Sequence, residues 1–138
     1  MHSITPFKKL LKNVELNAAR PSPTRVSGTP KYKEKTVDLD AEYLKHLFYD
    51  RQKSKCYWLG IELNPQWVFD SGHPLALSVD RLGYNYLKGE VVICSRFANL
   101  GRNTYPDDKF KEVLKYIKSQ WGWEEYLCNP PIQRELFK

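Results

Sequence analysis

Asp80 and Asn99 carry side-chain oxygens of the kind that bind magnesium ions in proteins. Hydrolysis of a phosphodiester needs a cation on the scissile phosphate, an activated water and a stabilised leaving oxygen. One Mg²⁺ or Mn²⁺ ion, held by a carboxylate and a neutral oxygen ligand, supplies the first and the third of these. The two residues are nineteen positions apart, so they reach one ion only if the chain folds back between them. Residues of these types are also common as a turn residue and a surface amide.

A β-hairpin is the element that would bring these two residues together. Residues 75–81 (LALSVDR) predict a strand that carries Asp80 near its end. Gly83 and Gly89 bracket a turn, and the β-branched run at residues 91–94 (VVIC) predicts the second strand.

A short helix that carries Asn99 is predicted directly after the hairpin. Ile93, Phe97 and Leu100 recur at the spacing of one helical face, and Gly101 is expected to end the helix. Strand, turn, strand and helix together predict the centre of an α+β domain.

Three further helices are predicted around this centre from apolar residues at helical spacing. Thr5 and Pro6 are expected to open the first helix. Asp38 or Asp40 is expected to cap the second, and Asp107 to begin the third. The predicted buried residues are Phe7, Leu10, Leu11 and Val14, then Leu44, Leu47 and Phe48, then Phe110, Val113, Leu114 and Ile117.

The segments between these elements are predicted to be turns and loops. Residues 20–36 are rich in Pro, Ser, Thr, Gly and Lys, which indicates an exposed linker. Residues 56–63 predict a turn or hairpin around Gly60, and residues 65–74 predict an irregular connection.

The net charge of +6 resides entirely in the first quarter of the chain. Residues 1–35 hold eight basic and two acidic side chains, whereas the rest carries fourteen of each sign. A basic segment joined to a neutral body is a common electrostatic footprint of nucleic-acid binding, and a solvated tail is the alternative. We therefore divide the chain into a basic N-terminal helix and linker arm, residues 1–36, and a main domain, residues 37–138.

The composition of the chain limits the classes of protein to which it can belong. The 138 residues, 41% of them hydrophobic, suffice for one modest core. No apolar run has the length of a membrane span, and the N-terminus lacks the apolar run of a secretory signal, so a cytoplasmic protein is expected (host-cell cytoplasm for a viral protein). The three cysteines Cys56, Cys94 and Cys128 have no paired spacing, which argues against a disulfide framework.

Residues 56–103 resemble the HNH (His-Me finger, ββα-metal) endonuclease family, in particular its short, free-standing phage members. Those proteins carry a Cys-x-x-Thr/Cys-Gly-Ile turn, a Ser-Leu-Asp-Arg-Ile-Asp or Asp-His strand, Gly-Tyr and Gly-Asn-Val pieces, and a helix with an asparagine and a basic residue. The corresponding pieces here are Cys56-Tyr57-Trp58-Leu59-Gly60-Ile61, Ser78-Val79-Asp80-Arg81-Leu82, Gly83-Tyr84, Gly89-Glu90-Val91-Val92, and Asn99 with Arg102. A looser resemblance extends over residues 38–119.

The resemblance implies a ββα-metal core, a β-hairpin plus a short helix, flanked by additional helices. It implies Asp80 and Asn99 as ligands of one Mg²⁺ or Mn²⁺ ion. The general base of the family is a histidine, but that position is Arg81, whose pKa above about 12 prevents it from taking a proton from water. The asparagine that orients the histidine is replaced by Glu90, and the Asp that often ends the strand motif is replaced by Gly83.

Zinc-binding members of the family use two Cys-x-x-Cys pairs, and each pair is reduced to one cysteine here. Cys56 is followed by Leu59, and Cys94 by Phe97, at the second positions. Two thiolates do not complete a tetrahedral structural site. We expect no structural zinc and predict that both cysteines are small buried residues.

Glu90 is the first candidate to replace the missing base. A carboxylate near a cation can accept a proton or bind the metal, and Glu90 is predicted to lie across the hairpin from Asp80. A surface glutamate paired with Arg81 or Lys88 is the alternative. Tyr84 and Tyr86 would serve only with strongly lowered pKa values, and His73, which precedes the strand, only if the loop folded back toward Arg81.

Two functions are consistent with these residues. The first, which we expect, is a metal-dependent DNA endonuclease of HNH-like type with a non-standard general base, in which Arg81 and Glu90 are catalytic. The second is a catalytically inactive HNH-fold DNA-binding protein, in which Arg81 neutralises the phosphate. In both, the residues expected to bind DNA are Lys8, Lys9, Lys12, Arg20, Arg25, Arg96 and Arg102. Cutting of a palindromic site would require a homodimer.

Overall fold

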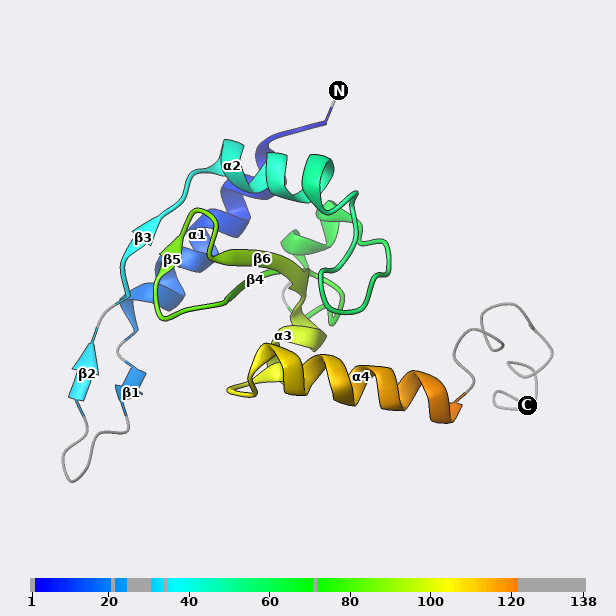
Figure 1. Ribbon diagram of the computed structural model, residues 1–138. Helices are drawn as coiled ribbons and strands as arrows, with labels where there is room; N and C mark the ends of the chain where they lie inside the picture. Colours follow the sequence, from blue (N-terminus) through cyan, green and yellow to red (C-terminus); the bar gives the residue numbers. More distant parts are fainter. Residues whose placement is uncertain (1, 21, 25–30, 34, 71, 122–138) are drawn as a thin grey trace. The chain divides into compact units, whose positions relative to one another are not determined.

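The computed structural model describes residues 2–20, 22–24, 31–33, 35–70 and 72–121. It is a mixed α+β structure, as predicted, and divides into two compact units, residues 1–103 and 104–138 (Figure 1). The first unit contains α1 (Thr5–Ala19), β1 (Ser22–Thr24), β2 (Lys31–Lys33), β3 (Val37–Asp38), α2 (Ala41–His46), the π-helical turn η1 (Leu47–Arg51), the 3₁₀ helix η2 (Pro65–Phe69), β4 (Leu77–Arg81), β5 (Tyr86–Leu87), β6 (Val91–Ser95) and α3 (Arg96–Arg102). The second contains α4 (Asp107–Trp121), which begins at the predicted residue.

No helix in the described part of the chain combines the length and the apolar character that crossing a membrane requires.

β4 and β6 form an antiparallel hairpin, and α3 starts at the residue after β6. The register pairs Leu77 with Ser95 and Asp80 with Val92, so Asp80 lies near the end of β4. The Oγ of Ser95 accepts a hydrogen bond from the backbone N of Ala98 (3.1 Å) and caps α3. The two strands and the helix are therefore present in the predicted order.

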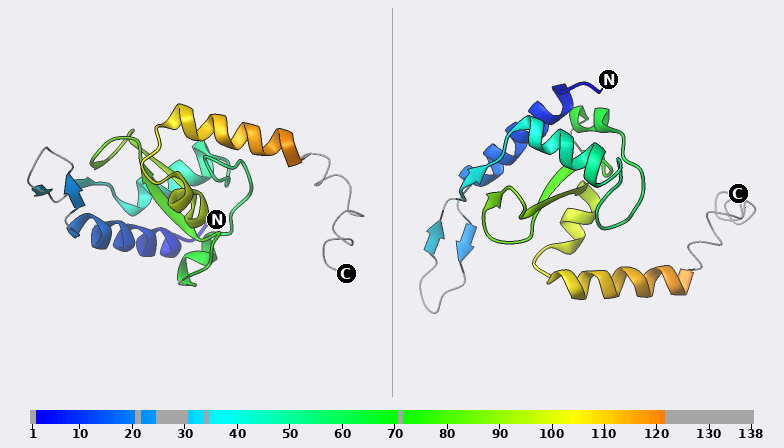
Figure 2. Two further views of the ribbon diagram at one scale, coloured as in Figure 1. Left: turned by 90° about the horizontal axis from the view of Figure 1, so that it is seen from below. Right: turned by 45° about the horizontal axis from the view of Figure 1, so that its top comes forward.

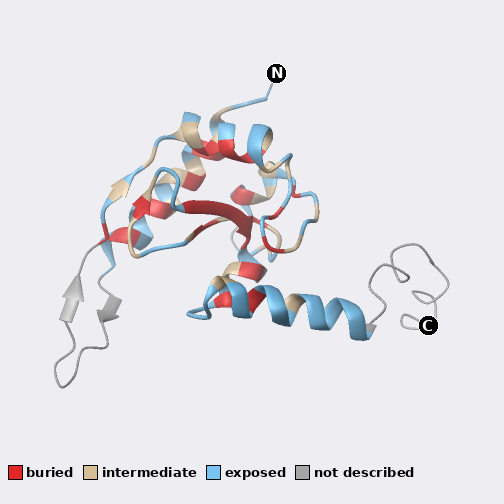
Figure 3. Cartoon of the chain, in the orientation of Figure 1, coloured by how far each residue is buried: buried red, intermediate tan, exposed pale blue. Residues whose placement is uncertain are grey.

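α1 belongs to the same compact unit as the hairpin and packs against α2, η2 and β4 (Figure 2). Its buried apolar side chains on one helical face are Phe7, Leu10, Val14 and Ala18. Leu11, predicted on the same face, is only half-buried, and Thr5 is the first helical residue and not the cap. Figure 3 shows the buried residues concentrated on the hairpin and on the sides of α1 and α2 that face it. The basic N-terminal helix is thus anchored to the body by its apolar face.

α2 is capped by Asp40, one of the two predicted alternatives. Its Oδ1 accepts a hydrogen bond from the backbone N of Tyr43 (2.7 Å). The predicted buried residues of this segment, Leu44, Leu47 and Phe48, are all buried. The Phe48 ring packs against the Phe7 ring of α1, with 5.9 Å between their centroids, so the first two helices share one core.

Three segments that were predicted to be irregular contain secondary structure. Within residues 20–36, β1 and β2 pair in an antiparallel ladder. Within residues 65–74, η2 begins after Asn64, whose Oδ1 accepts a hydrogen bond from Gln66 N (3.0 Å). β5 lies inside the predicted turn and pairs in parallel with β3. Strands of two or three residues and a single turn of 3₁₀ helix have too few positions to produce a periodic sequence pattern.

The buried face of α3 was predicted wrongly. Ile93 belongs to β6, and Phe97 and Leu100 are exposed. The buried residues of α3 are Ala98 and Arg102. The helix therefore buries a small residue and a cation, and the cation bonds to the Asp80 carboxylate of β4.

The end of α3 also differs from the prediction. Gly101 does not end the helix, which continues to Arg102. Asn103 follows at a φ of +50° and a ψ of −115°, a positive φ that is uncommon for residues other than glycine.

The side-chain amide of Gln52 ties the end of η1 to β6. Its Nε2 donates to the backbone O of Ile93 (2.6 Å) and of Lys55 (3.0 Å), and its Oε1 accepts from the backbone N of Ile93 (2.8 Å). The backbone N of Tyr57 also donates to the backbone O of Ile93 (3.0 Å), so Tyr57 and this amide together satisfy the backbone polar groups of Ile93, as a neighbouring strand would.

Replacing Gln52 by Ala is expected to lower the free energy of unfolding by about 1–3 kcal/mol, because the backbone N of Ile93 loses its acceptor and the backbone O of Ile93 keeps only Tyr57 N. Urea denaturation followed by circular dichroism measures this change. Gln66→Ala, at an exposed position in η2, is the control and is expected to stay within about 0.5 kcal/mol of the original protein. Equal stability of the two variants would contradict the role assigned to Gln52.

Candidate functional site

The Asp80 carboxylate is buried between the hairpin and α3, and both of its oxygens accept hydrogen bonds. Arg102 Nη1 donates to Oδ1 (2.7 Å), and Trp58 Nε1 donates to Oδ2 (2.9 Å). The Asp80 and Arg102 side chains are 8% and 10% exposed. Arg102 Nη1 also donates to the backbone O of Arg81 (3.0 Å), and its guanidinium carbon lies 5.1 Å from the Trp58 ring centre. We call Asp80, Arg102 and Trp58 the Asp80 cluster.

Asn99 lies against the same strand, close to the Asp80 cluster. Its Nδ2 donates to Ser78 Oγ (2.7 Å) and more weakly to the backbone O of Val79 (3.4 Å). The structure therefore brings both predicted metal ligands to β4, with Asn99 against Ser78 and Val79 and Asp80 at the next position. Each of the two nevertheless has partners of its own within the protein.

The side chains as they stand do not fit a Mg²⁺ ion at Asp80. An ion would have to approach oxygens that already accept bonds from Arg102 and Trp58, and the guanidinium charge would repel it. The described residues also contain no group of three or more His, Cys, Asp or Glu side chains placed to hold a metal. The Mg²⁺ or Mn²⁺ site stays a prediction, and it requires Arg102 to move away from Asp80.

Glu90, the candidate base, is exposed at the start of β6. It is opposite Leu82, whose backbone N donates to the backbone O of Glu90 (2.9 Å). Lys88, one of its proposed ion-pair partners, instead pairs with Asp40 (3.1 Å). Glu90 is thus exposed at the turn end of the hairpin, whereas the Asp80 carboxylate is buried.

Arg81, which replaces the family's histidine, lies against aromatic rings. Its Nη1 donates to the backbone O of Tyr84 (2.6 Å), and its guanidinium carbon lies 5.3 Å from the Tyr86 ring centre. Burial raises the pKa of Tyr86, so its phenol group keeps its proton more strongly. This argues against a role for Tyr86 as general base. Burial and the Arg81 charge lower the pKa of Lys35 nearby, so this end of the hairpin gathers positive charge.

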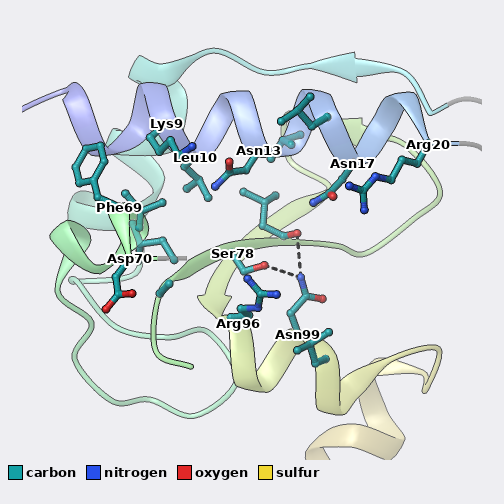
Figure 4. A pocket seen from close by; sticks show the side chains of 17 residues that line it. Lys9, Leu10, Asn13, Asn17, Arg20, Phe69, Asp70, Ser78, Arg96 and Asn99 are labelled. Carbon is teal, nitrogen blue, oxygen red and sulfur yellow. Dashed lines mark hydrogen bonds between the residues drawn. The ribbon is translucent and has the colours of Figure 1, made fainter. Parts of the chain in front are cut away.

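A groove of about 750 Å³ lies between α1, the start of β4 and α3, with η2 at one end (Figure 4). We call it the α1–β4 groove. Its polar lining side chains are Lys9, Asn13, Asn17, Arg20, Asp70, Ser78, Arg96 and Asn99. Three cations against one carboxylate make the lining positive, and Figure 4 shows the Asp70 carboxylate pointing away from α1.

The groove face of α1 is a polar stripe. Lys9, Asn13, Asn17 and Arg20 are separated by four, four and three positions, so they lie on one side of the helix. This stripe borders the apolar face that anchors α1, and buried residues such as Leu10 also contribute to the lining. The packing of α1 therefore directs the stripe toward β4 and α3.

Three of the cations predicted to bind DNA come together in the α1–β4 groove. Lys9 and Arg20 reach it from α1, and Arg96 reaches it from the first residue of α3. Asn99, predicted as a metal ligand, also lines the groove. In Figure 4 these side chains point from the two helices into the space between them.

The other four predicted cations are elsewhere. Lys8 and Lys12 are exposed and lie on the outer face of α1. Arg102 is buried against Asp80. Arg25 lies outside the described residues.

Several residues of the site were not identified from the sequence. Trp58 was counted only as part of a turn motif, and Asn13 and Asn17 were not singled out. The four-residue spacing from Lys9 through Asn13 to Asn17 was a visible signal for a polar helix face. No sequence pattern indicated that this face would meet Asn99.

Cys56 and Cys94 are buried, as predicted. Cys56 Sγ accepts hydrogen bonds from the backbone N of Leu59 (3.5 Å) and of Ser95 (3.3 Å), so protein donors hold the sulfur. Burial, with smaller contributions from Cys56 and Asp80, raises the pKa of Cys94 and favours the neutral thiol, whereas zinc binds the thiolate. The absence of structural zinc stays a prediction.

Comparison with known proteins adds no relative. No family model, no curated protein and no solved structure matches the chain. The HNH resemblance therefore rests on the motifs of residues 56–103 alone.

Replacing Arg102 by Met is expected to lower the free energy of unfolding by about 3–5 kcal/mol, because Asp80 then stays buried without its cation. Urea denaturation measures the loss. Arg96→Met, at an exposed position of the same helix, is the control and should change stability by less than about 0.5 kcal/mol.

The double variant Asp80→Asn with Arg102→Met separates the ion pair from packing. It removes both charges and keeps an acceptor for Trp58, so we expect it to be more stable than Arg102→Met alone. Additive losses in a double-mutant cycle would contradict the coupling of the two charges.

Proposed function

We propose that this protein binds DNA in the α1–β4 groove. The observation that carries the proposal is the meeting of Lys9, Arg20 and Arg96 in one groove, from two helices far apart in the sequence. Cations provide the charge-assisted bonds that phosphate accepts, and the groove amides and the Ser78 hydroxyl supply further polar contacts. The net charge of +6 favours association with a polyanion before any contact forms.

We further propose that β4, β6 and α3 are the ββα core of an HNH-like fold, and that the protein binds DNA without cutting it. The order of a hairpin followed at once by a helix supports the first part. The second is supported by the Asp80 cluster, in which a guanidinium holds the carboxylate that would bind the metal. Arg81 cannot act as the base, and Glu90 lies exposed at the turn end of the hairpin.

A metal-dependent DNA endonuclease is the second candidate. The proximity of Asn99 to Ser78 and Val79 favours it, because a ligand amide then lies beside the strand that carries Asp80. This function would need Arg102 to release Asp80 when Mg²⁺ or Mn²⁺ and DNA are present.

Groove cations are expected to contribute to DNA affinity individually. The assay titrates a fluorescein-labelled DNA probe, which has one duplex and one single-stranded part, and follows its anisotropy. Arg20→Gln and Arg96→Gln should each bind this probe about three- to tenfold more weakly than the original protein does. Each variant should also reduce the slope of log K against log salt by about 0.7–0.9, the contribution of one phosphate contact.

Lys8→Gln and Lys12→Gln are the matched controls, because they remove the same charge from the outer face of α1. We expect both to keep the slope of the original protein. If all four variants weaken binding equally, diffuse charge and not the groove would account for the affinity.

Cleavage distinguishes the two candidates. With Mg²⁺ or Mn²⁺, the protein is expected to leave supercoiled, linear and single-stranded DNA intact while still binding the anisotropy probe. Metal-dependent cutting that the double variant Asp80→Asn with Arg102→Met abolishes, with probe binding retained, would instead establish the endonuclease, because neither residue lines the groove.

A further inference from the structure

The interior of the α1–β4 groove differs chemically from its ends. Asn13 and Asn17 from α1 and Asn99 from α3 line it between the positions of Lys9 and Arg20 (Figure 4). Apolar side chains, including Leu10 and the 70% exposed Leu100, complete the lining. A site that bound phosphate alone would need donors and cations along its whole length.

Asn99 presents an acceptor to any ligand in the groove. Its Nδ2 hydrogens already donate to Ser78 Oγ and to the backbone O of Val79, so its carbonyl Oδ1 remains. A phosphodiester only accepts hydrogen bonds and gains nothing from a carbonyl oxygen. The amino and imino groups of a base donate, and in an unpaired strand they are exposed on the Watson–Crick edge.

Phe69 supplies an aromatic surface at the η2 end of the groove. Its side chain is 48% exposed and lines the groove near Lys9, as Figure 4 shows. Stacking of a base on an aromatic ring is independent of sequence and requires that the base be free of a complementary strand. Phe69 is therefore placed to hold a base next to a cation.

The cations of α1 are spaced for the backbone of a short stretch of strand. Lys9 and Arg20 are eleven residues apart, which corresponds to about 16 Å along a helix. Arg96 faces them from α3. The groove thus offers phosphate contacts on both walls and base contacts between them.

We propose that the ligand of the α1–β4 groove is an unpaired segment of DNA, with a base stacked on Phe69 and a base edge donating to Asn99. This rests on the proposed function and specifies its substrate class. A duplex keeps its base edges paired and stacked, so it could use only the cations of the groove.

The test compares two fluorescein-labelled probes of equal length, a single-stranded oligonucleotide without self-complementarity and its blunt duplex, by anisotropy with the full chain. The single strand is expected to bind at least about tenfold more tightly, from the stacking of one base. Equal binding or a preference for the duplex overturns this inference and leaves DNA binding intact. Binding to neither probe overturns both.

Phe69 variants test the stacking itself. Phe69→Ala is expected to weaken binding of the single strand about tenfold and to leave the duplex unchanged, and Phe69→Trp should restore binding. Phe97→Ala, at a 64% exposed position on α3 that does not line the groove, is the matched control and should have no effect. Equal effects of Phe69→Ala and Phe97→Ala on single-strand binding overturn the proposal.

Discussion

The arrangement of the site depends on one buried ion pair, between Asp80 and Arg102. It joins the end of β4 to the last turn of α3, while Trp58 brings in the turn that precedes η2 through a bond to the second carboxylate oxygen. The same guanidinium holds the backbone O of Arg81, so α3 cannot rotate about its axis without breaking two bonds. The orientations of Asn99 and Arg96, three and six residues earlier in the helix, follow from this constraint.

Attaching a helix through a buried ion pair costs desolvation free energy, and this cost matters for the interpretation of Asp80. Removing two charges from water costs several kcal/mol per ion and is repaid only by close geometry and additional hydrogen bonds, which Trp58 and the Arg81 carbonyl provide here. Asp80 therefore has a structural reason to be present, and Asn99 has one in its bonds to β4. In the sequence alone the two residues together suggested catalysis, because a scaffold had no visible need of either. Their presence is therefore equally expected in a protein that does not cut DNA.

The elements that have strong local patterns could be predicted from the sequence. Features that depend on contacts between distant segments of the chain could not. The apolar spacing of Phe7, Leu10 and Val14 and the β-branched run of β6 were sufficient to place α1 and the hairpin. The buried face of α3 was predicted from its apolar residues, but the partner across the interface is a carboxylate, so Arg102 is buried in their place. The groove could not be predicted, since it exists only because α1 and α3 approach each other across β4.

The two walls of the groove are held in place by different physical interactions. For this reason the long-range attraction of a ligand and its specific recognition depend on different parts of the protein. α1 is positioned by burial of its apolar stripe, and α3 by the Asp80–Arg102 pair. Although the first quarter of the chain carries the whole net charge, only part of it faces the groove, because Lys8 and Lys12 point outward. Long-range attraction of a polyanion depends on all of these charges, whereas the stereochemistry of binding depends on the few side chains that the two walls bring together. Under the proposed function, a change that loosens α3 would therefore lower selectivity more than it lowers the rate of association, since the net charge resides in the first quarter of the chain and not in α3.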